Sequence, residues 1–117
     1  MISIVIPTFN EVKNIIPLIK NLIVLISDFE YEIIVVDDDS PDGTSDEVKK
    51  YMKLNNRIKL ITRIGRSGLS SAIKEGLIFA QGKYIFVLDG DGQHHPSFVL
   101  DMLDVIDKKK IRYWHWK

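Results

Sequence analysis

Four short apolar runs, rich in isoleucine and valine, are spaced along the chain between longer segments of mixed polarity. Runs of this length and composition, bounded by polar or turn residues, are typical of β-strands. They predict strands over residues 2–6, 31–36, 58–62 and 84–88, with Pro7 ending the first. Residues 33–36 are apolar at every position. This pattern is typical of a strand covered on both faces, as in a parallel sheet between helices.

The segments between these runs show helical periodicity. The first carries an apolar stripe at steps of three and four, formed by Ile15, Ile19, Leu22, Ile23 and Ile26. Pro17 is compatible with this helix only in its first turn. Residues 44–47 have the sequence of a capping box, which predicts a second helix from Thr44 to residue 53. A third stripe covers residues 69–80, with Gly82 as the C-terminal glycine. The last helix is predicted to begin at Pro96 and to bury Val99, Met102, Leu103 and Ile106.

A strand–helix order that repeats with short connections predicts one α/β domain with a doubly wound, mostly parallel, Rossmann-like sheet. We assign residues 1–107 to this domain and residues 108–117 to a basic and aromatic C-terminal tail. Ligands of such sheets bind outside the carboxyl ends of the strands. Functional residues are therefore expected within residues 7–11, 37–43 and 89–96.

Net charge and the length of the apolar runs exclude several classes of protein. The 117 residues include 16 Lys and Arg against 16 Asp and Glu. Zero net charge argues against a nucleic-acid-binding protein, which normally carries a basic excess on one face. The longest aliphatic run, residues 22–26, is far shorter than the ~20 residues that span a bilayer, and no signal-peptide pattern opens the sequence. We therefore expect a cytoplasmic protein, with any membrane contact peripheral and at the cytoplasmic face.

The C-terminal tail allows two interpretations. Its five basic residues and two tryptophans suit a membrane interface. Alternatively, Lys108, Lys109 and Lys110 complement the C-terminus of the last helix, which is the interpretation we favour.

Two carboxylates follow the fourth predicted strand. Asp89 and Asp91 are two residues apart, so on an extended backbone they project to the same side. Mg²⁺ or Mn²⁺ takes one or two such carboxylates, and Gln93 could add a neutral oxygen. Gly90 lets a sugar or diphosphate approach the backbone closely. The alternative is a surface turn, in which Asp and Gly are common.

A second acidic group, residues 37–39, follows the second strand. Neighbouring like charges repel unless a cation or hydrogen-bond donors lie between them. We expect Asp37 and Asp38 to face a ligand, such as a cation, a ribose or a nucleobase. Asp42 and Asp46 are instead expected to serve the positive end of the following helix.

Four blocks of the sequence together resemble glycosyltransferase family 2, and within it the dolichol-phosphate (polyprenyl-phosphate) mannose synthases. The blocks are residues 3–11, 35–44, Gly68 and Leu69 with Ala72, and 89–96. The resemblance implies the donor-binding half of a GT-A fold. It further implies metal-dependent transfer, with Mg²⁺ or Mn²⁺, of a hexose, with mannose favoured. The donor would be a nucleoside diphosphate sugar such as GDP-mannose, and the acceptor a polyprenyl phosphate.

Carried over by position, the resemblance assigns Pro7, Phe9 and Glu11 to a loop that cradles the nucleotide. It assigns Asp38, with Val36 beside it, to the base, and Gly90 to the donor. Asp89 and Asp91 become the catalytic pair, and together with Gln93 the metal ligands. Arg63 and Gly68 fall near the donor, whereas His94 and His95 are interpreted as leading into the last helix.

The sequence departs from the family pattern at three positions and in length. Phe9 replaces a common Tyr, Asp39 replaces a Gly, and Ser70 replaces a frequent second Gly. Asp39 is expected to strain its turn or repel a diphosphate. Family members continue for about as many residues again, and that part supplies acceptor recognition. A non-catalytic nucleotide-sugar-binding half-domain, completed by a partner chain or a homo-oligomer, is therefore one alternative. A Mg²⁺-binding receiver-type signalling domain is another.

Overall fold

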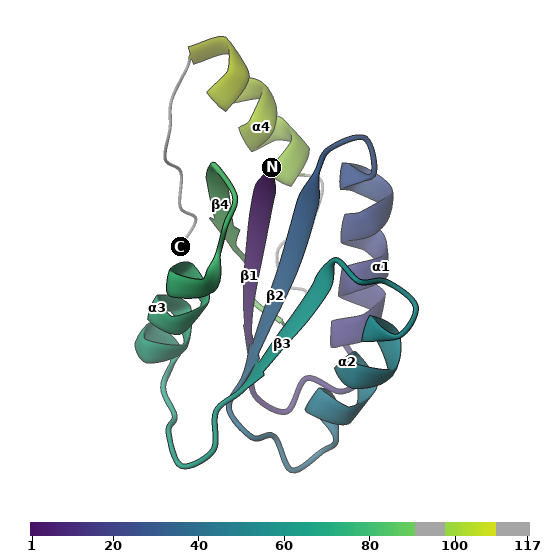
Figure 1. Cartoon of the computed structure of the whole chain (residues 1–117), viewed down its shortest axis with the longest axis vertical. Helices are drawn as coiled ribbons and strands as arrows, with labels where there is room; N and C mark the ends of the chain where they lie inside the picture. Colours follow the sequence, from purple (N-terminus) through teal and green to yellow (C-terminus); the bar gives the residue numbers. More distant parts are fainter. Residues whose placement is uncertain (91–97, 110–117) are drawn as a thin grey trace.

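The structure is a computed structural model that describes residues 1–90 and 98–109 (Figure 1). Four parallel strands form one sheet in the order β3-β2-β1-β4. In chain order the elements are β1 (Ile2–Thr8), α1 (Ile15–Ile26), β2 (Tyr31–Asp37), α2 (Thr44–Met52), β3 (Ile58–Thr62), α3 (Leu69–Phe79), β4 (Tyr84–Val87) and α4 (Phe98–Lys109). The predicted α/β class and parallel sheet are confirmed.

Pro7 lies inside β1 and does not end it. It pairs with Val36 of β2, whereas the pairing of β1 with β4 stops at Val5. The Val5 carbonyl accepts a hydrogen bond from Leu88 on the β4 side, and residues 5 and 7 of a strand point the same way. The missing N–H of Pro7 therefore lies on the side where β4 has already ended, so no ladder hydrogen bond is lost.

The two faces of the sheet are covered unequally. Residues of α1, α2 and α4 form the larger apolar cluster with one face, while α3 lies on the other (Figure 1). Of the predicted stripe on α3, only Ala72 and Gly76 are buried, and Leu69 and Leu77 are exposed. A Cβ at Gly76 would lie 2.3 Å from the Val5 side chain, so a glycine is required for the helix to approach β1 this closely.

The helix termini differ from the sequence expectations in two places. Thr44 is the first residue of α2 and does not cap it. Gly43 is the N-cap, with φ of 90°, and the Thr44 hydroxyl donates to Asp42. Gly82 is no C-terminal cap either, because α3 ends at Phe79. A Cβ at Gly82 would lie 2.5 Å from Ser3 Oγ, so Gly82 serves close packing against β1.

The predictions for α1 and α4 agree with the structure where it describes them, except that Met102 is only partly buried. Pro17 is the third residue of α1, and Val99 and Leu103 of α4 are buried. Pro96, the side chain of Ile106 and residues 110–117 lie outside the described residues. Within residues 1–90 and 98–109, no helix has the length and apolarity needed to cross a bilayer.

Candidate functional site

The carboxyl ends of β1 and β2 and the N-terminus of α3 enclose a pocket of about 390 Å³. The residues that line it are Pro7, Thr8, Phe9, Asp38, Ser67, Gly68, Leu69 and Ala72. Three predicted donor-binding residues, Pro7, Phe9 and Asp38, thus lie around one pocket. The sequence analysis did not single out Thr8 and Ser67.

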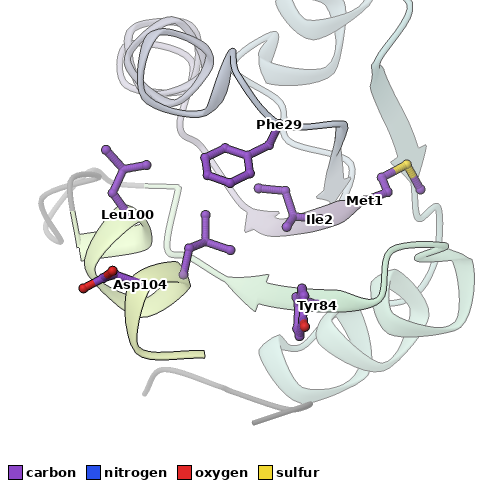
Figure 2. Close-up of a pocket in the computed structure, with 7 residues that line it drawn as sticks. Met1, Ile2, Phe29, Tyr84, Leu100 and Asp104 are labelled. Carbon is purple, nitrogen blue, oxygen red and sulfur yellow. The ribbon is translucent and has the colours of Figure 1, made fainter. Parts of the chain in front are cut away.

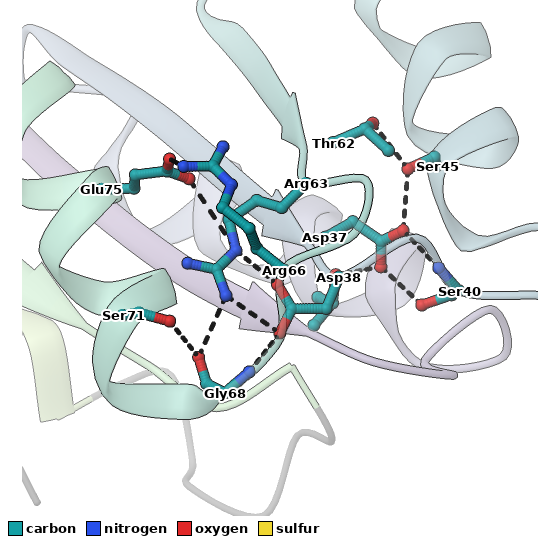
Figure 3. A network of polar contacts seen from close by, with 11 residues as sticks. Asp37, Asp38, Ser40, Ser45, Thr62, Arg63, Arg66, Gly68, Ser71 and Glu75 are labelled. Carbon is teal, nitrogen blue, oxygen red and sulfur yellow. Dashed lines mark hydrogen bonds and ion pairs between the residues drawn. The ribbon is translucent and has the colours of Figure 1, made fainter.

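Asp38 is held from two sides by other residues (Figure 3). Arg63 Nε donates to its Oδ1 at 2.7 Å, and the Gly68 N–H donates to its Oδ2 at 2.9 Å. Arg63 is 1% exposed and also approaches the Gly68 carbonyl at 3.4 Å. The segment between β3 and α3 is therefore fixed to the end of β2, which places Arg63 and Gly68 beside the pocket, as expected.

Asp37 does not face a ligand, and the expectation that it would is wrong. The residue is fully buried. Its Oδ1 accepts hydrogen bonds from the Thr8 and Ser40 hydroxyls, and its Oδ2 accepts from the Ser40 N–H and the Ser45 hydroxyl (Figure 3). These four hydrogen bonds come from three segments and occupy both carboxylate oxygens, so Asp37 is not available as a bridge to a cation. Asp37 instead fixes the loops around the pocket.

The loops after β1 and β2 are joined by further hydrogen bonds. Asp42 Oδ2 accepts from the Val12 N–H, and the Glu11 N–H donates to Thr44 Oγ1. Partial desolvation raises the pKa of Asp42, but hydrogen bonds from Thr44 and the Val12 N–H outweigh it and hold this pKa below its ordinary value. Asp42 therefore serves the start of α2, as expected. The Glu11 carboxylate accepts from Asn14 and does not line the pocket.

Asp39 adopts a left-handed backbone conformation, with φ of 54°. Glycine adopts this conformation without strain, and Asp is among the few other residues that tolerate it. The structure thus gives a physical reason for glycine in the family pattern at this position. The Asp39 side chain is exposed.

The start of the loop after β4 packs directly against the end of β1. Asp89 is exposed, and Gly90 is buried. A Cβ at Gly90 would lie 2.8 Å from Thr8 Cγ2 and 3.2 Å from the Pro7 carbonyl oxygen, so this glycine is needed for packing against the protein itself. Asp89 thereby follows the strand next to β1, at the same edge of the sheet as the pocket.

The predicted metal ligands are only partly within the described residues. Asp91 and Gln93 lie outside them, as do His94 and His95. Among residues 1–90 and 98–104, no group of three His, Cys, Asp or Glu side chains could hold a metal ion. Asp89 offers carboxylate oxygen at the strand end, which is the donor type that Mg²⁺ and Mn²⁺ prefer. Of the three predicted ligands, Asp89 is the one that lies within the described residues.

Val36 does not reach the pocket with its side chain. It is fully buried with Val5, Ile34 and Ala72 beneath α3. Any contact of Val36 with a ligand would have to come from its backbone. Its side chain instead supports the helix whose N-terminus lines the pocket.

A second pocket, of about 400 Å³, lies at the opposite edge of the sheet (Figure 2). Its lining is mostly apolar and consists of Met1, Ile2, Phe29, Tyr84, Leu100, Leu103 and Asp104. It lies at the amino ends of β1 and β4, away from the edge where doubly wound sheets bind ligands. None of the predicted site residues lines it.

The pocket at the carboxyl edge can hold a planar heterocycle. Phe9 is 57% exposed and presents an aromatic ring, and the Asp38 carboxylate accepts hydrogen bonds. A nucleobase with a ring N–H suits this pair, and Asp89 follows β4 at the same edge of the sheet. The geometry defines a nucleotide-binding α/β domain of the GT-A type.

Solved structures support this class. The structure of S. aureus TarS superposes with a TM-score of 0.76 and 29% identity, over 93% of this chain and 20% of that chain. A mannosyltransferase from Pyrobaculum calidifontis, solved with GDP-Man and Mn²⁺, superposes with a TM-score of 0.58 and 27% identity. That match covers 77% of this chain and 27% of the mannosyltransferase.

The family model described as Glycosyl transferase family 2 matches residues 3–112, and the chain belongs to this family. It is 36% identical over 105 residues to a dolichol-phosphate mannosyltransferase of Pyrococcus furiosus, and 36% identical over 100 residues to that of Saccharomyces cerevisiae. These matches cover 90% and 83% of this chain, but only 30% and 38% of the relatives. The resemblance stated from the sequence motifs is confirmed.

The receiver-type alternative is wrong. In that architecture the first strand lies between the second and the third. Here β1 lies between β2 and β4. The sheet order and the family match agree in excluding it.

Proposed function

We propose that this chain is the donor-binding part of a metal-dependent glycosyltransferase. It would bind a nucleoside diphosphate sugar, with GDP-mannose favoured, for transfer of the hexose to a polyprenyl phosphate. The observation that carries this proposal is the pocket in which Phe9 and Asp38 lie together, at the same sheet edge as Asp89. The names of the dolichol-phosphate mannosyltransferases that it resembles favour mannose and a polyprenyl acceptor.

Each part of the donor has a counterpart in the chain. The base would stack on Phe9 and donate its ring N–H to Asp38, which is acceptor-only when ionised. Guanine and uracil carry such an N–H, whereas adenine presents an acceptor there. A relative bound to GDP-Man and TarS bound to UDP-GlcNAc are consistent with this choice of bases.

Mg²⁺ or Mn²⁺ would be held by Asp89, Asp91 and Gln93, and would supply charge neutralisation for the diphosphate that leaves. Gly90, which precedes Asp91 in the sequence, packs against Pro7 and Thr8 at the end of β1, and both of these residues line the pocket. A phosphate acceptor is already anionic near neutral pH, so a strong general base is less necessary than for a hydroxyl acceptor.

Donor binding can be measured as stabilisation against heat. At a ligand concentration of a hundred times Kd, binding adds about 2.7 kcal/mol to the free energy of unfolding. We expect this gain with GDP-mannose and Mn²⁺, and a loss of most of it in Asp38→Asn and Asp91→Asn. The control is Glu47→Gln, which also converts an acid to its amide but on an exposed side chain of α2. Absence of any shift with GDP- and UDP-sugars would refute donor binding.

A non-catalytic half-domain is the second candidate, because the chain spans about a third of the length of the relatives it matches. Radiolabelled GDP-mannose and polyprenyl phosphate separate the two candidates. Mannolipid formed by the chain alone supports transfer, whereas donor binding without product supports the half-domain. Product that forms only with a partner chain or at concentrations that favour a homo-oligomer would point to completion by association.

The location of the protein follows from the proposed acceptor. A polyprenyl phosphate lies in a membrane, so the proposal adds peripheral contact at the membrane face to the expected cytoplasmic location. Flotation with vesicles that contain polyprenyl phosphate tests this part. Recovery only in the soluble fraction would contradict it.

A further inference from the structure

A second carboxylate competes with Asp38 for the buried Arg63. Arg63 Nε lies 2.7 Å from Asp38 Oδ1 and 3.8 Å from Glu75 Oε2, so one nitrogen faces two acids (Figure 3). The other Glu75 oxygen, Oε1, pairs with Arg66, whose side chain is 62% exposed. The four residues form a chain of alternating charge from the surface to the pocket.

Glu75 is incompletely satisfied in this position. Its Oε2 is buried and accepts no hydrogen bond, and its side chain is 19% exposed. A buried carboxylate oxygen without a hydrogen-bond donor lowers the free energy of unfolding unless a nearby cation compensates its charge. Arg63 Nε lies 3.8 Å from this oxygen, which is an ion-pair distance but too long for a hydrogen bond.

The two hydrogen bonds between Arg63 and Asp38 differ in length. A guanidinium and a carboxylate prefer two short parallel hydrogen bonds. Here the Nε limb is 2.7 Å, but Nη2 lies 3.5 Å from Asp38 Oδ2. Nη2 also donates to the Gly68 carbonyl at 3.4 Å, so this nitrogen is divided between two acceptors, and Asp38 Oδ2 keeps the Gly68 N–H as its short donor.

We infer that Glu75 is a positioning residue for base recognition, because it shares the Arg63 guanidinium with Asp38. With Arg66 on Glu75 the four charges sum to zero, so Glu75 offsets positive charge that would otherwise be directed at Asp38. Without the charge of Glu75, Asp38 alone would balance Arg63, which would weaken Asp38 as an acceptor for a base N–H. This inference rests on the proposed function, because it assigns Asp38 to the base.

The experiment compares Glu75→Gln with the wild-type chain in binding of GDP, UDP, ADP and pyrophosphate, by calorimetry with Mn²⁺. We expect a loss of about fivefold to tenfold in affinity for whichever of GDP and UDP binds better, a coupling typical of neighbouring charges. Affinities for ADP and pyrophosphate should stay unchanged, because neither donates a ring N–H to Asp38. A general loss of fold would lower all four affinities together.

Glu47→Gln has the same charge change on an exposed side chain of α2 and serves as the matched control. Glu75→Asp keeps the charge but withdraws it by one methylene, so it should give a smaller loss of the same selective kind. If Glu75→Gln does not fold, Glu75→Asp is the variant that tests the inference. Wild-type selectivity in both variants would overturn the inference. Failure of the wild-type chain to bind either GDP or UDP would instead overturn the proposed function.

Discussion

Glu32 holds together the end of the sheet opposite the pocket, and its replacement should be costly. The residue is 2% exposed in β2. Its Oε2 accepts from Ser3 Oγ and from the Gln81 N–H, both at 2.6 Å, and its Oε1 accepts from Lys59 Nζ at 2.7 Å. These donors come from β1, β3 and the segment after α3, so one carboxylate joins three parts of the fold.

The magnitude follows from what each substitution leaves unpaired. Glu32→Ala leaves the buried Ser3 hydroxyl and the part-buried Gln81 N–H without their acceptor, at about 1–3 kcal/mol for each group. Lys59 is 48% exposed and can return to water, so its loss adds little. We expect a loss of about 2–5 kcal/mol in the free energy of unfolding. Glu32→Gln, which can still accept from Ser3 and Gln81, should lose about 1–2 kcal/mol.

The pH dependence of the free energy of unfolding separates the effect of the Glu32 charge from the effect of its side-chain shape. Burial by itself raises the pKa of Glu32, but hydrogen bonds from Lys59, Ser3 and the Gln81 N–H outweigh it and lower this pKa below its ordinary value of 4.5. The stability that the carboxylate contributes is therefore complete above pH 4.5 and is lost as the pH falls through the lowered pKa. The gap between wild type and Glu32→Gln should narrow over that range.

Urea unfolding at pH 7 and at several values below pH 4.5 measures both effects. With a slope of about 1–3 kcal/mol/M, the loss in Glu32→Ala should lower the midpoint by roughly 1 M or more. Lys59→Gln is the control, because it removes only the half-exposed partner and should cost about 1 kcal/mol or less. An unchanged midpoint in Glu32→Ala, or a gap to Glu32→Gln that is constant with pH, would refute the reasoning.

Two backbone predictions can be tested by the same urea assay. Asp39→Val should cost about 1–2 kcal/mol because a β-branched residue is strained at φ of 54°, whereas Asp39→Gly should stay within about 1 kcal/mol of wild type. Equal midpoints for the two variants would contradict the left-handed conformation. Gly82→Ala should lose about 1–3 kcal/mol, because its Cβ would lie 2.7 Å from the Ser3 backbone nitrogen, where little can yield. Gly65→Ala meets open space at φ of 76° and should lose less, so a larger loss there would contradict the packing argument.

The strands and the edge that carries the pocket could be predicted because they depend on local patterns. Runs of Ile and Val identified all four strands to within two residues, and polar residues after them identified the pocket. The position of Pro7 could not be predicted, since it depends on where the neighbouring strand β4 ends. The role of Gly82 depends likewise on the approach of β1.

At the site, the acidic group after β2 likewise combines a feature that the sequence predicts with one that depends on tertiary contacts. Asp37 and Asp38 look equivalent in the sequence, but alternate residues at the end of a strand point to opposite sides. One carboxylate meets hydroxyls from Thr8, Ser40 and Ser45, and the other meets Arg63. Their partners come from other segments, so only the tertiary structure separates a loop anchor from a base-binding candidate. Family resemblance supplied that distinction for Asp38.

Because α3 packs closely on the sheet at Gly76, this residue can influence the proposed donor site although it lies far from it. Gly76 lies eight positions after Gly68, about 12 Å along the helix axis. A methyl group there would push the helix off β1 and draw the Gly68 amide away from Asp38. Substitution of this buried glycine can therefore change the shape of the proposed donor site while the residues that line the site are retained.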